Sequence, residues 1–134
     1  KFQSFENEED KKSEKTNKGL AYYNLGLAYR ERSIYEENFN PEEAERDLTK
    51  AINSYQKAAE ILKDNYSIQY NLALAYHLNN QFQKAGKHYC NAISTEPMNY
   101  EAHYNLAILL KHLKLIFIQT ILLKNIRIRQ KKNF

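Results

Sequence analysis

The chain has 134 residues, of which 43% are hydrophobic, and it contains a single Cys. This length is enough for one domain with a buried core, and one Cys excludes an intramolecular disulfide framework. The Cys count leaves the redox compartment open but favours a reducing one, and we expect a cytoplasmic location. Because the chain does not begin with Met, we also expect it to be a fragment or a processed protein.

The net charge of +4 is divided unevenly along the chain. From Lys114 onward there are six Lys or Arg and no acidic residue, whereas the first 113 residues carry 14 Lys or Arg against 16 Asp or Glu, a net charge of −2. The basic character thus belongs to a C-terminal tail, and the rest of the chain is mildly acidic. The sequence has no RNA-binding motif, and no helix pattern before the tail has a basic face, so nucleic acid is not an expected partner.

Residues 1–18 carry five acidic and five basic side chains, and Phe2 and Phe5 are their only bulky apolar residues. Such a composition buries too little apolar surface to offset the entropy lost on ordering. We therefore expect a polar linker over residues 1–18.

Residues 19–65 have the pattern of two helices. Asn40 precedes Pro41, and Glu43 follows three residues after Asn40, which is typical of a capped helix start. From this point one apolar face continues at helical spacing to the end of the segment. Its residues are Ala44, Leu48, Ala51, Ile52, Tyr55, Ala58, Ala59 and Leu62.

Residues 66–99 repeat this organisation in a shorter form. The sequence Tyr-Asn-Leu occurs at residues 23–25 and again at residues 70–72. It occurs a third time 34 residues later, at residues 104–106. Asn79-Asn80 predicts a turn between two helices, and Pro97 predicts a break after the second. The unit is therefore a helix, a tight turn, a second helix and a break.

This unit resembles the tetratricopeptide repeat family. The family's pattern of leucine, small residue and aromatic, then alanine, aromatic, alanine and proline, is matched in order by Leu72, Ala73, Tyr76, Ala85, Tyr89, Ala92 and Pro97. The resemblance implies an all-α fold of antiparallel helix pairs in a right-handed superhelix, here about two and a half repeats. Residues 19–65 are then a first repeat with 13 inserted residues, so we expect both of its helices to be about six residues longer, projecting roughly 9 Å beyond the array.

Residues 100–113 match the first helix of a third repeat, but residues 114–134 depart from the pattern. The two alanines of a second helix would fall on Gln119 and Ile126, and no Ala, Tyr, Asp or Glu occurs from Leu115 to Phe134. A change of reading frame in an A/T-rich gene would produce such a shift, and we hold this as a hypothesis.

As a helix, the tail places Thr120, Lys124, Arg127 and Lys131 on one narrow stripe with apolar residues around most of the rest. We expect a capping helix laid over the exposed end of the array, with a membrane-surface or partner-binding helix as the alternative. The uncharged run from Leu115 to Leu123 is too short to span a bilayer, so we expect no transmembrane span. If the end of the array stays exposed, self-association is expected there.

The family's first helices line a concave face, where partner peptides are held. The tyrosine and asparagine of the repeated sequence recur there, which is similar to the asparagine ladder of O-linked N-acetylglucosamine transferase repeats. The alternative is that these amides bridge adjacent helices. The expected peptide-binding residues are Asn24, Asn71, Asn105, Tyr23, Tyr70, Tyr104, Leu27, Leu74, His77 and Ile108. The carboxylate clamp of some family members is not expected, because only Asn71 fits it and its cations are missing.

No constellation of residues predicts catalysis or a metal. His88 and Cys90 are two residues apart on a helix and point in different directions, and no pair has zinc-ligand spacing. We expect neither a cofactor nor enzyme activity in these residues. The expected function is a protein-protein interaction scaffold that binds an extended peptide or a partner protein. The alternative is the substrate-recruiting region of a larger enzyme, such as a glycosyltransferase.

Overall fold

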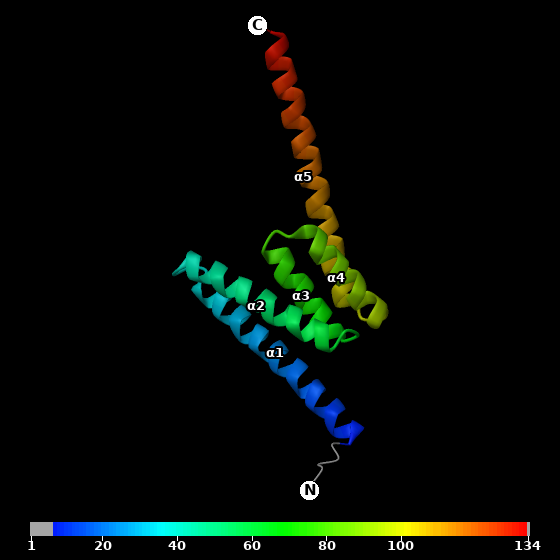
Figure 1. Ribbon diagram of the computed structural model, residues 1–134. Helices are drawn as coiled ribbons and strands as arrows, with labels where there is room; N and C mark the ends of the chain where they lie inside the picture. Colours follow the sequence, from blue (N-terminus) through cyan, green and yellow to red (C-terminus); the bar gives the residue numbers. More distant parts are fainter. Residues whose placement is uncertain (1–6, 134) are drawn as a thin grey trace.

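The computed structural model describes residues 7–133, which form an all-α structure, as predicted (Figure 1). The described residues contain five helices and no strand. The helices are α1 (Glu8–Glu36), α2 (Pro41–Ile61), α3 (Tyr66–Leu78), α4 (Phe82–Thr95) and α5 (Tyr100–Lys132).

Each helix packs mainly on its neighbour in the chain. The helices α1 and α2 form one antiparallel pair, α3 and α4 form a second, and α5 packs on α4 and α3 (Figure 1). The core lies between these layers, and its largest fully buried apolar side chains are Tyr55, Tyr89, Ile68, Leu72 and Leu109.

The residues that define the repeated pattern form this core. Leu72, Tyr76 and Tyr89 are at most 3% exposed, and Ala73, Ala85 and Ala92 are completely buried. Small side chains at these positions let two helices approach closely, and the larger ones fill the surrounding space. The pattern in the sequence is therefore explained by packing alone.

The start of α1 corrects the predicted linker. Residues 8–18 are helical, so the prediction of a polar linker is wrong for them, and residues 1–6 lie outside the described residues. Lys and Glu are good helix formers, and extending an existing helix costs far less than nucleating one. The acidic first turn of Glu8, Glu9 and Asp10 also complements the helix dipole.

The first helix pair is longer than the second, as the insertion predicted, but only α2 fits the expected excess of about six residues, because residues 8–18 lengthen α1 at its start as well. The helices α1 and α2 have 29 and 21 residues, against 13 and 14 for α3 and α4. The predicted cap at the start of α2 is confirmed: the Asn40 side chain accepts a hydrogen bond from the amide of Glu43 at 3.3 Å, and Pro41 opens the helix. The first pair therefore overhangs the turn between α3 and α4.

The predicted breaks between the other helices are confirmed as well. Asn80 has a φ of 59° in the turn between α3 and α4, a left-handed conformation that asparagine tolerates better than most residues. Asn65 and Asn99 cap the starts of α3 and α5 with their side-chain oxygens. The Tyr66 hydroxyl also accepts a hydrogen bond from the buried amide of Ala102 at 3.2 Å, which fixes the start of α5 on α3.

The course of α5 overturns the expected capping helix. The helix runs without a break from Tyr100 to Lys132, and its second half projects away from the other four helices instead of folding over the end of the array (Figure 1). From Lys114 to Asn133 every residue is exposed. The physical reason lies in the sequence, because no Gly, Pro, Asn, Asp or Ser occurs from Leu106 to Lys124 to end the helix.

Two glycines give a stability prediction with a built-in control. A Cβ at Gly26 would lie 2.6 Å from the Tyr55 ring, which is fully buried, whereas a Cβ at Gly86 would lie 3.8 Å from Leu109. We expect Gly26→Ala to lower the free energy of unfolding by about 1 to 3 kcal/mol through overpacking. Gly86→Ala should raise it by up to about 1 kcal/mol through helix propensity. Urea denaturation measures both, and equal effects would contradict the close contact at Gly26.

Candidate functional site

The predicted peptide-binding residues lie on α1, α3 and α5. Together they form a surface that we call the tyrosine face. It consists of Tyr23, Asn24 and Leu27 of α1, of Tyr70, Asn71, Leu74 and His77 of α3, and of Tyr104, Asn105 and Ile108 of α5. Most of these side chains are half-buried, but Tyr104 and Ile108 are 64% and 41% exposed.

The same hydrogen bond joins successive helices across the tyrosine face. Asn71 donates through Nδ2 to the Tyr23 hydroxyl at 3.1 Å, and Asn105 donates to the Tyr70 hydroxyl at 2.9 Å. Each Nδ2 also donates to the backbone carbonyl four residues earlier, at 2.8 Å for Asn71 and 3.0 Å for Asn105. Both amide hydrogens are thus used inside the protein, and each amide offers a ligand only its oxygen.

The two ends of this row lack a neighbour. Asn24 is exposed and makes no side-chain hydrogen bond among the described residues, of which α1 is the first helix. Tyr104, at the other end, is the most exposed tyrosine of the face. The structure therefore brings Tyr23, Asn71, Tyr70 and Asn105 together in bonded pairs and leaves Asn24 and Tyr104 at the edges. Asparagines that bridge helices were the alternative in the sequence analysis, and a role in peptide binding stays a prediction.

Two tyrosines that the sequence analysis did not assign to the site reach it from the second helix of each pair. The Tyr89 hydroxyl of α4 lies 3.2 Å from Nδ1 of His77, whereas the Tyr55 hydroxyl of α2 is buried with no hydrogen-bond partner. Burial lowers the pKa of His77, and the neighbouring His112 lowers it further. His77 therefore favours its neutral form, which can accept a hydrogen bond from Tyr89.

Arg30 occupies the position on α1 that corresponds to His77 on α3. Burial raises the pKa of four tyrosines, that of Tyr55 to about 12, and the positive charge of Arg30 offsets part of the rise in each. These tyrosines are Tyr23, Tyr55, Tyr70 and Tyr89. Within residues 7–133 Arg30 forms no ion pair, and its Nε is buried without a hydrogen-bond partner. Arg30 is therefore a half-buried cation next to the tyrosine face, and a carboxylate could neutralise it.

The overhang of the first helix pair adds a pocket that sequence reasoning missed. The pocket has a volume of about 410 Å³ and opens beside Arg30. It is lined by Arg30, Ser33, Ile34, Glu37, Pro41, Ala44, Glu45, Leu48, Leu78, Asn79 and Asn80. The 13 inserted residues were the signal that could have located the pocket. A longer first pair extends past the turn between α3 and α4 and leaves a space beside it.

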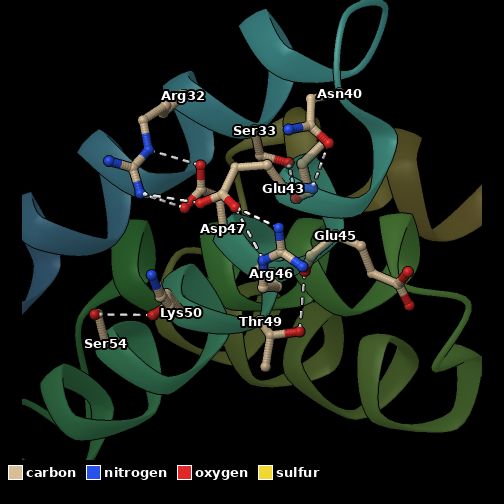
Figure 2. A network of polar contacts seen from close by, with 11 residues as sticks. Arg32, Ser33, Asn40, Glu43, Glu45, Arg46, Asp47, Thr49, Lys50 and Ser54 are labelled. Carbon is tan, nitrogen blue, oxygen red and sulfur yellow. Dashed lines mark hydrogen bonds and ion pairs between the residues drawn. The ribbon is translucent and has the colours of Figure 1, made fainter.

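A polar network holds the overhanging parts of α1 and α2 together (Figure 2). Arg32 contacts the fully buried carboxylate of Asp47 through Nε at 2.7 Å and through Nη2 at 2.5 Å. The Ser33 hydroxyl donates to the Ala44 carbonyl at 2.7 Å. The hydrogen bonds from Arg32 hold the pKa of Asp47 below its usual value, against the opposing effect of burial.

This network predicts a pH-dependent loss of stability. The pKa of Asp47 is lowered in the folded state, so its contribution is present above the unfolded pKa of about 4 and is lost as the pH falls through the folded pKa. In Arg32→Met the buried carboxylate loses its partner, and burial then raises its pKa. We expect Arg32→Met to melt at a lower temperature than the parent. The difference between the two melting temperatures should be larger at pH 7 than at pH 4.

The control for this prediction is Arg46→Met. Arg46 pairs with Glu43 one turn away on the same helix and is exposed. Its removal should change the melting temperature little at either pH. A deficit in Arg32→Met that does not depend on pH would contradict the assignment of the effect to Asp47.

The candidate metal ligands do not gather. Within residues 7–133, no group of three His, Cys, Asp or Glu side chains is placed to hold a metal ion. Cys90 is exposed, and Nδ1 of His88 lies 2.7 Å from the Gln69 side-chain oxygen. The His77 and His112 rings approach to 6.4 Å between centroids, and their neighbours are aromatic.

Neither a family model nor a curated protein sequence matches this chain.

Proposed function

We propose that the chain is a tetratricopeptide-type interaction module that binds an extended segment of a partner protein along the tyrosine face. The observation that carries the proposal is the repeated bond between Tyr23 and Asn71 and between Tyr70 and Asn105. The same pair of side chains thus recurs between α1 and α3 and between α3 and α5. Such a row suits a ligand that is itself periodic, as an extended peptide is.

The chemistry of the face limits what the peptide can be. The half-buried tyrosines and leucines favour apolar side chains, and the free oxygens of Asn71 and Asn105 can accept from backbone amides. Arg30 favours an Asp or Glu near one end of the peptide. We therefore propose a ligand with apolar residues and at least one carboxylate, and this module needs no catalytic residue of its own.

A peptide-library screen against the chain, followed by titration of the best ligand, tests this function. We expect the selected peptides to be enriched in Asp or Glu beside apolar residues. The double variant Tyr104→Ala, Ile108→Ser should bind the best peptide at least about tenfold more weakly, since it removes roughly 1.4 kcal/mol or more of contact energy. Both side chains are exposed, so the fold should tolerate their loss.

The matched control is Tyr35→Ala. Tyr35 is 69% exposed on α1, close to the 64% of Tyr104, but it lies near the far end of the helix against Phe39. Its removal should leave the affinity unchanged. Equal affinities for the parent and the double variant, with circular dichroism showing both to be folded, would exclude the tyrosine face as the binding site.

A further inference from the structure

The outer half of α5 carries apolar surface that nothing in the structure covers. Nine large apolar side chains between Leu115 and Ile128 are 39% to 66% exposed. This half of α5 stands clear of α1 to α4 (Figure 1). A contiguous patch of this kind on a protein surface usually marks a contact with another molecule or with a membrane.

The distribution of residues around the helix indicates the shape of that contact. Thr120, Lys124, Arg127 and Lys131 form one narrow polar stripe at helical spacing, and most of the remaining circumference is apolar from Leu115 to Ile128. A helix that packs on one neighbour shows the reverse, a narrow apolar stripe on a polar helix. The surface that covers α5 must therefore be apolar over a wide arc, and the boundary between the headgroups and the acyl chains of a lipid bilayer can provide such a surface.

The charge indicates which kind of bilayer. From Lys114 onward the chain has six Lys or Arg, and no acidic residue follows Glu101. Pairing the same segment of two copies in parallel would bring like charges together, whereas anionic phospholipid headgroups attract them. A second copy of this chain is thus the less favourable occupant.

The length of the apolar run indicates how the helix lies. By length and composition α5 could cross a membrane, with a mean hydropathy of 1.9 over its most apolar 18 residues. The uncharged run from Leu115 to Leu123 is only about 14 Å long, however, roughly half the thickness of the hydrocarbon core. We propose that residues 115–128 of α5 lie in the surface of an anionic phospholipid membrane, with Thr120, Lys124 and Arg127 of the polar stripe facing the headgroups.

Co-sedimentation of the full chain with vesicles tests this proposal. We expect binding to vesicles of phosphatidylcholine mixed with phosphatidylserine, weaker binding to phosphatidylcholine alone, and a loss of binding as salt is raised. The triple variant Lys124→Glu, Arg127→Glu, Lys131→Glu should have a partition coefficient into the mixed vesicles that is at least roughly tenfold lower than that of the parent. A second variant, Phe117→Ser, Leu122→Ser, should also bind more weakly because it removes apolar surface.

The matched control is Lys11→Glu, Lys15→Glu, Lys18→Glu, which makes the same change in net charge at exposed positions of α1. It should bind the mixed vesicles about as well as the parent. Failure of the helical parent chain to bind the mixed vesicles at low salt would overturn the proposal, as would equal losses in the two charge variants. Protection of a C-terminal tag from protease inside vesicles would also overturn it, because the helix would then cross the bilayer.

Discussion

Replacing Tyr89 by alanine is expected to unfold the second helix pair. Tyr89 is completely buried, packs near Tyr70 and His77, and holds α4 against α3. Removing a large buried aromatic side chain costs about 3 to 5 kcal/mol, a large part of the roughly 5 to 15 kcal/mol that stabilises a typical domain. Because each helix packs mainly on its neighbours, we expect α3, α4 and the base of α5 to lose order first. Hydrogen exchange followed by mass spectrometry would show the loss of protection in these helices.

The conservative variant Tyr89→Phe is the control. It keeps the ring and removes only the hydroxyl that contacts His77, so its cost should be about 0.5 to 1.5 kcal/mol. Protection in α1 and α2 should survive both substitutions better than protection in α3 and α4. A uniform, simultaneous loss of protection along the whole chain in Tyr89→Ala would show instead that the described residues unfold as one cooperative unit.

The helices and the core were predictable because local signals and packing agree. Asn40, Asn79 and Asn80 mark helix ends through hydrogen bonds and backbone conformations that depend on a few neighbouring residues. The alanines at the closest helix contacts occur at helical spacing, so their burial follows from the pattern. The longer first pair followed from residue counts alone, since thirteen extra residues between two matched segments must lengthen the helices or form a loop.

The features that sequence reasoning missed depend on contacts between distant segments or on missing signals. The pocket beside Arg30 exists because α1 and α2 overhang a turn whose residues lie about 30 to 50 positions further along the chain, and no local pattern encodes this contact. The predictions of a linker at residues 8–18 and of a capping helix at the C-terminus were both wrong. They were based on amino-acid composition, which does not show that a helix can continue without packing on another helix. Residues 8–18 and the outer half of α5 each continue a helix that is already formed, and neither contains a Gly or Pro that would end it.

The double variant Asn71→Ala, Asn105→Ala is expected to lower the free energy of unfolding by about 2 to 4 kcal/mol. Each amide makes two hydrogen bonds, and four bonds at a net value of about 0.5 to 1.5 kcal/mol each give about 2 to 6 kcal/mol. The expected loss lies in the lower part of this range because water can reach the half-exposed tyrosine hydroxyls in the variant. Urea denaturation of the parent and the variant measures the change. Under conditions in which the variant is folded, it should bind an extended peptide only slightly more weakly than the parent, because each amide offers the peptide a single oxygen.

Asn24→Ala separates a role in stability from a role in binding. Asn24 has the same place in the repeated sequence, but it is exposed and has no side-chain hydrogen bond among the described residues, so its loss should change stability by less than about 0.5 kcal/mol. If a peptide continues along the whole row, Asn24 is also the one amide of the three whose hydrogens are free to bind it. A fall in affinity in Asn24→Ala with unchanged stability would therefore place the end of the peptide over α1. A large loss of stability in Asn24→Ala would contradict the view that only the two amides between helices act as bridges.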